Sequence, residues 1–234
     1  MPSLRGSSYE GVAIRDAVRM ASGVAWNEDY ADPASDVGNE IGLTSLERLA
    51  YLGNQPRVAP AGAVFNYNTG ETHLVGAVIR SAIGNNLSTY LAASIWKPFG
   101  MEAQANWMLV EPSGAEHGGC CISATLRDYA RIGLFALRGG VLPDGRRVLP
   151  GDWMAQSTAR SPANPGYGYL WWLGDNGAYG ALGIYGQAIW ISPADSVVIV
   201  THSVWPRATG HEFSAHRSAL FTALTAAVRR NGPG

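Results

Sequence analysis

Residues 167–203 read YGYLWWLGDNGAYGALGIYGQAIWISPADSVVIVTHS, and this stretch decides the class of fold. Aromatic and β-branched residues recur in short runs, and Gly, Asn, Asp and Pro interrupt them, which is typical of β-strands joined by turns. The pattern predicts an antiparallel sheet with strands over residues 167–173, 181–185, 188–192 and 196–203. Pro193-Ala194-Asp195 is expected to form a tight turn between the last two strands.

Helical patterns lie on both sides of this sheet in the sequence. Apolar residues recur at helical spacing over residues 10–22, 44–51, 69–83, 87–96, 123–137 and 213–230, with a short helix around residues 155–156. Thr44 stands at an N-cap with Glu47 at the capping-box position, and Ser123 is the expected cap of its helix. Helices, then strands, then a helix that can cover the sheet is α+β order, not alternating βαβ order.

The length of 234 residues is enough for one sizeable domain or for two small ones. We predict a single domain over residues 1–234, with a helical part over about 9–160 and the sheet with its terminal helix over about 165–230. No internal repeat or low-complexity tract divides the chain.

Charge is scarce and nearly balanced. Charged residues make up 15% of the chain and the formal net charge is −1, which gives no electrostatic case for binding nucleic acid or an anionic membrane. No run of about 18 apolar residues is present, so we expect no segment that spans a bilayer. Residues 1–6 lack the apolar stretch of a signal peptide, so the chain at face value predicts a cytoplasmic protein. The sequence does not specify an oligomeric state.

Cysteine and histidine offer little for a disulfide or metal site. Cys120 and Cys121 are adjacent, and because neighbouring cysteines seldom form a disulfide, we expect no disulfide-stapled fold. His211 and His216 lie five residues apart. At about 100° per residue their rings would point roughly 140° apart on a helix, which argues against a shared zinc ion. No phosphate-binding loop occurs, and the sequence predicts neither a metal nor a cofactor.

Nucleophile patterns are weak in this chain. His117-Gly118-Gly119-Cys120 lacks an orienting third group, and a Gly-rich turn explains it. No Gly-x-Ser-x-Gly elbow occurs. Ser94-Ile95-Trp96-Lys97 has the spacing that lets an amine activate a hydroxyl on one helix face. Because it closes a helix and runs into Pro98, we interpret it as a helix end, with Lys97 favourable near the C-terminus.

Two other segments are better candidates for a functional site. Tyr67 directly precedes a predicted helix, where a phenol beside a cation can act as a general acid or base. The alternative is a packing residue with a satisfied hydroxyl. In Gly183-Ile184-Tyr185-Gly186-Gln187, paired glycines allow close approach to the backbone, whose N–H groups could bind an oxyanion. A bulged hairpin explains the same five residues without a ligand.

At these segments the chain resembles the serine β-lactamase and penicillin-binding-protein superfamily, in the class C-like branch that includes esterases and 6-aminohexanoate-dimer hydrolases. The matching stretches run in family order across nearly the whole chain, at residues 14–24, 28–36, 65–76, 95–101, 126–133 and 183–187. Each match is weak alone, and together they are specific. The Asp-Tyr-x-Asp-Pro-x-Ser-Asp loop at residues 29–36 points most narrowly to the nylon-oligomer hydrolases.

The resemblance implies a β-lactamase/transpeptidase-like fold and a role for each segment. Tyr67 matches the general acid/base of the family's second motif, whose usual Asn is replaced here by Thr69. The segment of Ile184, Tyr185, Gly186 and Gln187 would face the oxyanion and the substrate, with a backbone N–H near Ile184 as one oxyanion donor. Tyr185 stands near the Lys of the family's Lys-Thr-Gly motif, which favours a neutral ester or amide over a β-lactam carboxylate.

The family's first motif, a Ser-x-x-Lys on a buried helix, is expected some tens of residues before the 10–22 helix. Lys97 is the one lysine here and falls in a stretch that the family uses structurally, so the resemblance implies that this chain lacks the nucleophile, its lysine and the early strands. One hypothesis is an N-terminally truncated serine hydrolase of a small ester or amide. The other is a complete, non-catalytic remnant that binds a ligand or a partner.

Overall fold

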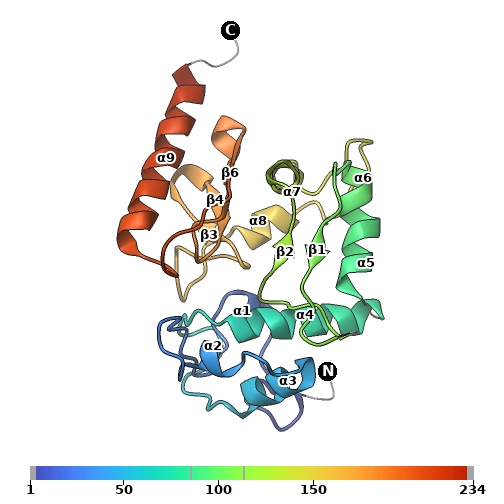
Figure 1. Ribbon diagram of the computed structural model, residues 1–234, viewed down its shortest axis with the longest axis vertical. Helices are drawn as coiled ribbons and strands as arrows, with labels where there is room; N and C mark the ends of the chain where they lie inside the picture. Colours follow the sequence, from blue (N-terminus) through green and yellow to red (C-terminus); the bar gives the residue numbers. More distant parts are fainter. Residues whose placement is uncertain (1–3, 85, 113, 231–234) are drawn as a thin grey trace. The chain divides into compact units, whose positions relative to one another are not determined.

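The computed structural model describes residues 4–84, 86–112 and 114–230, and the chain folds into two compact units (Figure 1). The first comprises Met1–Trp96, Ala105–Ser123 and Ser161–Pro165. The second comprises Lys97–Gln104, Ala124–Arg160 and Gly166–Gly234. Residues 97–104 and 124–160, which the sequence pattern groups with the helical part, therefore cluster with the sheet.

Helix α4 is the centre of the first unit. It spans Thr69–Ile83 and contacts α1 (Ile14–Val18), α3 (Ser45–Asn54) and α5 (Leu87–Leu91). The unit also contains α2 (Asp36–Asn39), the π-helical stretch η2 (Ala92–Trp96) and an antiparallel pair of β1 (Asn106–Trp107) and β2 (Ile122–Ser123). The sequence pattern did not predict this short strand pair.

Side-chain caps explain the bounds of the two long helices of this unit. The side chain of Asn68 accepts a hydrogen bond from the Glu71 N–H at 3.0 Å, and α4 ends at Gly84 in the left-handed region, with φ of 83°. The predicted span of α4 is confirmed. Thr44 and Glu47 form the predicted capping box of α3, which runs three residues beyond the predicted end at Tyr51.

The helix predicted over residues 10–22 is shorter in the structure. α1 ends at Val18, and Met20 adopts a φ of 55°, which breaks the helical path and places its side chain in the interior. The chain then runs extended, and Val24 pairs with Arg57 in an isolated antiparallel bridge. A turn, not further helix, buries the apolar residues that follow α1.

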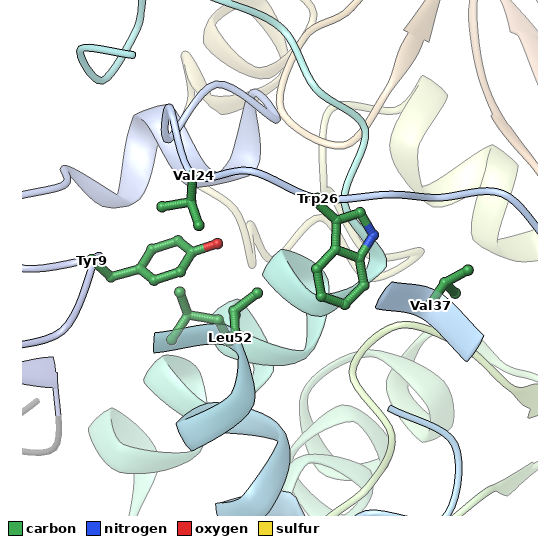
Figure 2. Close-up of a cluster of buried hydrophobic side chains, with 6 residues drawn as sticks. Tyr9, Val24, Trp26, Val37 and Leu52 are labelled. Atoms are coloured by element: carbon green, nitrogen blue, oxygen red, sulfur yellow. The ribbon is translucent and has the colours of Figure 1, made fainter. Parts of the chain in front are cut away.

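The core of the first unit fixes the first turn of α4. Its buried members are Tyr9, Val24, Trp26, Val37, Leu52 and Leu74. Figure 2 shows Trp26 with Tyr9, Val24 and Leu52 gathered on one side of its indole. A Cβ added at Gly70 would lie 2.9 Å from Leu52 Cδ1 and 3.1 Å from the Trp26 ring. A side chain here would push the Leu52 and Trp26 side chains aside, so glycine lets the core pack directly against the turn that follows Tyr67.

The second unit is built on a four-stranded antiparallel sheet in the order β3-β4-β5-β6. Its strands are β3 (Trp172–Leu173), β4 (Tyr179–Leu182), β5 (Ala188–Ser192) and β6 (Val197–Thr201). Its helices are α6 (Lys97–Phe99), α7 (Leu126–Leu137), α8 (Trp153–Ser157) and α9 (His211–Arg230). The predicted α+β class and its antiparallel sheet are confirmed.

Helices cover both faces of this sheet, α7 on one and α9 on the other (Figure 1). Ile189 and Val198 face α7, where a Cβ added at Gly133 would lie 2.5 Å from Val198 Cγ1. Ala188 and Ile199 face Phe221 of α9. Residues alternate between the faces because successive side chains of a strand point in opposite directions.

Several predicted bounds were wrong in this unit. The predicted strand 167–173 is reduced to β3, since Leu170 adopts a left-handed φ of 58°. The predicted strand 181–185 is displaced to Tyr179–Leu182, so residues 183–187 form a turn. Helix α7 begins at Leu126 with Thr125 as its cap, because Ser123, in the first unit, pairs with Asn106 in the β1–β2 ladder. Strand 188–192 and the turn at 193–195 are confirmed.

Cys120 and Cys121 are joined by a disulfide, a bond that neighbouring cysteines seldom form. The backbone accommodates the closure because Cys121 adopts a φ of 131°, outside the usual region for a side-chain-bearing residue. The bond links adjacent residues and therefore fastens no distant part of the chain.

Within residues 4–84, 86–112 and 114–230, no helix is both long enough and apolar enough to cross a membrane.

Candidate active site

Tyr67 is held by its neighbours two residues before α4 begins. The Asn66 N–H donates to the Met20 carbonyl at 2.8 Å, and the Asn66 side-chain amide donates to the Trp26 carbonyl at 3.0 Å. On the other side, Asn68 is fully buried and caps α4. These anchors fix the backbone of Tyr67, whose side chain is half-buried. A functional group on such a rigid support keeps its direction.

Glu28 is the hub of the polar contacts around the first turn of α4. The Thr69 N–H donates to Glu28 Oε2 at 3.0 Å. The hydroxyls of Thr69 and Tyr30 and the indole N–H of Trp26 donate to the same carboxylate. Burial and then the hydrogen bond to Glu28 raise the pKa of Tyr30, so that phenol remains a donor. Four donors to one carboxylate tie the loop at residues 28–36 to α4.

The electrostatics around Tyr67 keep its phenol protonated. Burial and then the negative charge of Glu28 raise the pKa of Tyr67 above its ordinary value. Before Tyr67 can accept a proton from a nucleophile, a nearby cation must stabilise the phenolate. Lys97, the one lysine of the chain, belongs to the second unit and is exposed.

Glu71 is a buried carboxyl in the same turn of α4. Its Oε1 accepts a hydrogen bond from the Tyr9 hydroxyl at 3.0 Å, whereas its Oε2 has no hydrogen-bond partner among the described residues. Burial raises the pKa of Glu71 to about 7. The side chain therefore changes charge near neutral pH inside the core that supports Tyr67.

Substitution of Glu71 by Gln is expected to remove one component of the pH dependence of stability. The pKa of Glu71 is about 7 in the fold against 4.5 for an ordinary glutamate, so the folded state binds its proton more tightly. The stability it contributes is fully present below about pH 4.5 and is lost as pH rises through about 7. Between about pH 5 and 8, the melting temperature of the wild type should fall relative to that of Glu71→Gln.

Thermal unfolding followed by circular dichroism measures this difference. Glu47→Gln is the control, because Glu47 lies on the exposed start of α3 and hydrogen bonds from Thr44 lower its pKa. The difference between wild type and Glu47→Gln should stay constant over the same pH range. Parallel curves for wild type and Glu71→Gln would contradict the buried, titrating carboxyl.

Ser45 and His73 lie as close together as a nucleophile and its base. The His73 ring, however, donates its hydrogen bond to Ser45 instead of accepting one from it. Ser45 Oγ lies 3.0 Å from His73 Nε2. The Gly118 N–H donates to His73 Nδ1 at 3.3 Å, so the ring proton resides on Nε2 and points to Ser45. Burial and then Arg48 lower the pKa of His73 to about 4. A neutral ring that donates to the hydroxyl does not activate it.

Ser94 and Lys97 also fail as a nucleophile pair. Ser94 lies half-buried within η2, and Lys97 is exposed at the start of α6. A lysine that activates a serine is desolvated by its surroundings, and an exposed lysine does not meet that condition. No group of three or more His, Cys, Asp or Glu side chains gathers into a metal site in the described part of the chain.

Residues 183–187 form the turn between β4 and β5. The Gly183 N–H donates to the Gln187 carbonyl at 2.7 Å, the Gly186 N–H donates to the Gly183 carbonyl at 3.1 Å, and Gly186 has a φ of 90°. This is a three-residue hairpin loop that closes with a bulge at a left-handed glycine. The bulged-hairpin alternative therefore describes the local structure, and Ile184 lies on a turn, not on a strand.

The turn leaves the backbone N–H of Ile184 unused. The Thr209 N–H donates to the Ile184 carbonyl at 2.7 Å, and the Trp205 N–H donates to the Tyr185 carbonyl at 3.1 Å. The Tyr185 N–H donates to the Gln187 side-chain oxygen at 3.2 Å. The Ile184 N–H has no acceptor within the portion of the chain that the structure describes. A fixed turn with a free N–H can bind an oxyanion.

The predicted site residues fall into two groups. Ile184, Tyr185, Gly186 and Gln187 come together in one turn of the second unit, and Tyr67 belongs to the first unit. Sequence reasoning missed Glu28 as the partner of Thr69, which lies 41 residues further along the chain. The one available signal was the position of Glu28 directly before the Asp-Tyr-x-Asp-Pro loop.

The sheet covered by helices, and the helical unit that carries Tyr67, agree with the β-lactamase/transpeptidase-like fold that the sequence motifs predicted. The model of the Beta-lactamase family matches residues 1–223, and the chain belongs to this family. Solved structures with the same fold include a penicillin-binding-protein homologue from Caulobacter crescentus, which agrees with the fold that the sequence motifs predicted.

The chain is similar to the following proteins in sequence or in structure. A 6-aminohexanoate-dimer hydrolase of Paenarthrobacter ureafaciens is 28% identical over 88% of this chain, which spans 58% of that relative. A Bacillus anthracis protein, provisionally assigned the same activity, superposes with a TM-score of 0.84 at 24% identity over 98% of this chain and 64% of its own. EstCE1, a hydrolase with promiscuous acyltransferase activity, superposes with a TM-score of 0.71 at 15% identity over 94% of this chain and 75% of its own.

Proposed function

We propose that this domain is part of a serine hydrolase that cleaves a small amide or ester through an acyl-enzyme. Membership of the Beta-lactamase family supports the reaction class. The observation that carries the proposal is the rigid mounting of Tyr67, whose neighbours Asn66 and Asn68 are both anchored directly before α4. The similarity to a 6-aminohexanoate-dimer hydrolase favours a linear amide as the substrate.

In this mechanism Tyr67 carries protons and the turn at Ile184 stabilises charge. A serine oxygen adds to the substrate carbonyl carbon while Tyr67, assisted by a cation, takes the hydroxyl proton. The negative oxygen of the tetrahedral intermediate accepts a hydrogen bond from the Ile184 N–H. Tyr67 then passes the proton to the departing amine or alcohol, and the acyl group remains on the serine. Water adds to the acyl carbon, and the carboxylic acid leaves as the proton returns to the serine oxygen.

We also propose that the nucleophile lies outside residues 1–234. The exposed position of Lys97 supports this, because the serines of this chain then lack a desolvated lysine partner. The raised pKa of Tyr67 supports it too, because proton acceptance there requires a cation. The span of the chain, 58% of the length of the Paenarthrobacter relative, leaves room for such a segment.

A polypeptide of residues 1–234 should not react with a fluorophosphonate probe, which phosphonylates activated serines with loss of fluoride. The measurement is intact-mass spectrometry after incubation, with an active serine hydrolase in the same tube as a positive control for the probe. Ser94→Ala provides the matched variant, since Ser94 is the serine that has a lysine three residues later. Stoichiometric labelling that disappears in Ser94→Ala would make Ser94 the nucleophile and overturn this part of the proposal.

A panel of substrates on the enzyme that contains this domain tests the substrate class. We expect cleavage of linear amides of 6-aminohexanoate and of short-chain esters. Hydrolysis of β-lactams alone would contradict the proposed class. Absence of all hydrolysis by the folded enzyme would favour the non-catalytic remnant.

A further inference from the structure

A cavity of about 230 Å³ lies in the second unit, and the proposed mechanism does not use it. Its walls come from the turn at Gly186, from the end of β6 with the segment that follows, and from the first half of α9. All of these belong to one compact unit. The volume is enough for a small organic molecule but not for a large ligand.

Arg217 of α9 supplies this cavity with a cation that has no acidic partner in the described part of the chain. Arg217 lines the cavity, and its Nη1 atom is buried with no hydrogen-bond acceptor in the described part of the chain. Its guanidinium carbon lies 4.9 Å from the centre of the Trp205 ring. Burial lowers the pKa of Arg217, which reflects the cost of holding this charge away from water. A buried guanidinium is normally matched by an anion.

Two carboxylates on or against α9, one at each end of the helix, are paired with other arginines. Glu212 pairs with Arg207 at 2.8 Å. Asp195 pairs with Arg229 through two hydrogen bonds. Neither acid lines the cavity, so the charge of Arg217 is left for a molecule from solution.

The other polar groups of the cavity include hydrogen-bond donors, and the His216 imidazole also lines it. The Thr201 hydroxyl donates to the Gly186 carbonyl at 2.9 Å, which satisfies the acceptor in that wall. The Ser203 hydroxyl and the Trp205 indole N–H line the same space and donate to no acceptor in the described residues. Phe213 and Leu220 provide apolar wall. One cation, the hydroxyl and indole donors and an apolar wall together favour a ligand with an anionic end and a hydrocarbon part.

We propose that this cavity binds the carboxylate of a small aliphatic acid, with Arg217 as its charge partner and Phe213 and Leu220 against its methylene chain. A single guanidinium balances one negative charge, which favours a carboxylate over a phosphate dianion. The cavity reaches Gly186, two residues from the Ile184 N–H. The carboxylate therefore belongs either to one end of a substrate or to a free organic acid. The first case rests on the proposed function, and the second case does not.

Calorimetric titration of the chain with hexanoate tests the binding directly, with hexanamide as the uncharged analogue. Hexanoate should bind at least 10-fold more tightly than hexanamide. Arg217→Gln should weaken hexanoate at least 10-fold. Arg229→Gln, which removes another arginine of α9 that pairs with Asp195 outside the cavity, should stay within about 2-fold of the wild type.

Stability measurements separate this role from a structural one. Without ligand, the melting temperature of Arg217→Gln should equal or exceed that of the wild type, because the variant removes an unpaired buried charge. Leu220→Trp keeps the cation but fills the cavity, and it should abolish hexanoate binding. If Arg217→Gln does not fold, Leu220→Trp still tests whether hexanoate binds in this cavity. Equal binding of hexanoate and hexanamide, tighter binding of inorganic phosphate, or hexanoate binding that survives in Leu220→Trp would overturn the proposal.

Kinetics on the enzyme that contains this domain distinguish the two sources of the carboxylate. If it is a substrate end, Arg217→Gln should raise KM at least 10-fold for an amide substrate with a free carboxylate and leave KM for its methyl ester unchanged. If it is a separate acid, KM should be unchanged for both substrates while the calorimetric loss remains. Failure of all hydrolysis would count against the proposed function and leave the binding result as it stands.

Discussion

Substitution of Tyr67 by Phe, in the proposed serine hydrolase, is expected to lower kcat by about 10²- to 10⁴-fold, the contribution that general acid–base catalysis makes in enzymes. The variant removes one hydroxyl and keeps the ring. The anchors of the segment are the Asn66 hydrogen bonds and the Asn68 cap, and neither involves the phenol oxygen. The loss should therefore appear in kcat, with the fold intact.

Steady-state kinetics on an amide substrate measure this effect, and circular dichroism verifies the fold. Tyr90→Phe is the matched control, because Tyr90 lies exposed on α5 and should tolerate loss of its hydroxyl without loss of turnover. An unchanged kcat in Tyr67→Phe would remove Tyr67 from the mechanism. A rise in KM alone would reassign it to substrate binding.

Substitution of Asp128 by Ala is expected to lower the free energy of unfolding by about 3–5 kcal/mol, the cost of breaking a buried charge network. Asp128 lies on α7 with no exposed surface. Its carboxylate accepts hydrogen bonds from the N–H groups of Glu102 at 2.8 Å and Ala103 at 3.1 Å. The Thr125 hydroxyl and Arg131 also donate to it, each at 3.0 Å. The alanine variant leaves these donors without an acceptor.

Urea unfolding measures this loss. Asp144→Ala is the control: Asp144 is exposed and accepts one hydrogen bond from the Arg146 N–H, so its removal should cost about 1 kcal/mol or less. Burial alone would raise the pKa of Asp128, but hydrogen bonds led by that from the Glu102 N–H lower it overall. Its contribution to stability is thus present above about pH 4 and lost as pH falls below that. A cost below about 1 kcal/mol for Asp128→Ala would contradict the network.

The sequence predicted correctly those helices and strands whose ends are fixed by capping or turn residues. Helix α4 has its cap at Asn68 and a left-handed glycine at Gly84, and both signals are readable in the sequence, so its span was predicted correctly. Strand β5 is bounded by turn residues and was also predicted correctly. The helix predicted over residues 10–22 was too long because burial of Met20 in the tertiary structure overrides its local pattern.

The turn at residues 183–187 shows where composition misleads. Ile184 and Tyr185 have high strand propensity, and this favoured a strand that the structure does not contain. The deciding feature is the left-handed φ of 90° at Gly186, which closes the hairpin. Glycine permits this conformation without requiring it, so the sequence left both alternatives open.

The candidate site likewise contains residues that the sequence predicted and residues that it did not. Tyr67 was found because its motif is contiguous in the sequence. Glu28 and the unpartnered Arg217 were missed, because their roles depend on contacts between distant parts of the chain. Glu28 meets Thr69 across 41 residues. The single-domain prediction over residues 1–234 remains a prediction beside the two compact units.

The most direct test of the proposed mechanism is to trap the acyl-enzyme. The enzyme that contains this domain would be mixed with an ester of 6-aminohexanoate, quenched in acid within its first turnover, digested, and mapped by mass spectrometry. We predict one acyl group per enzyme, on a serine outside residues 1–234, with the peptide that carries Ser94 unmodified and with acylation slowed at least 10²-fold in Tyr67→Phe. An acyl group on Ser94, or turnover without any acylated serine, would contradict the mechanism.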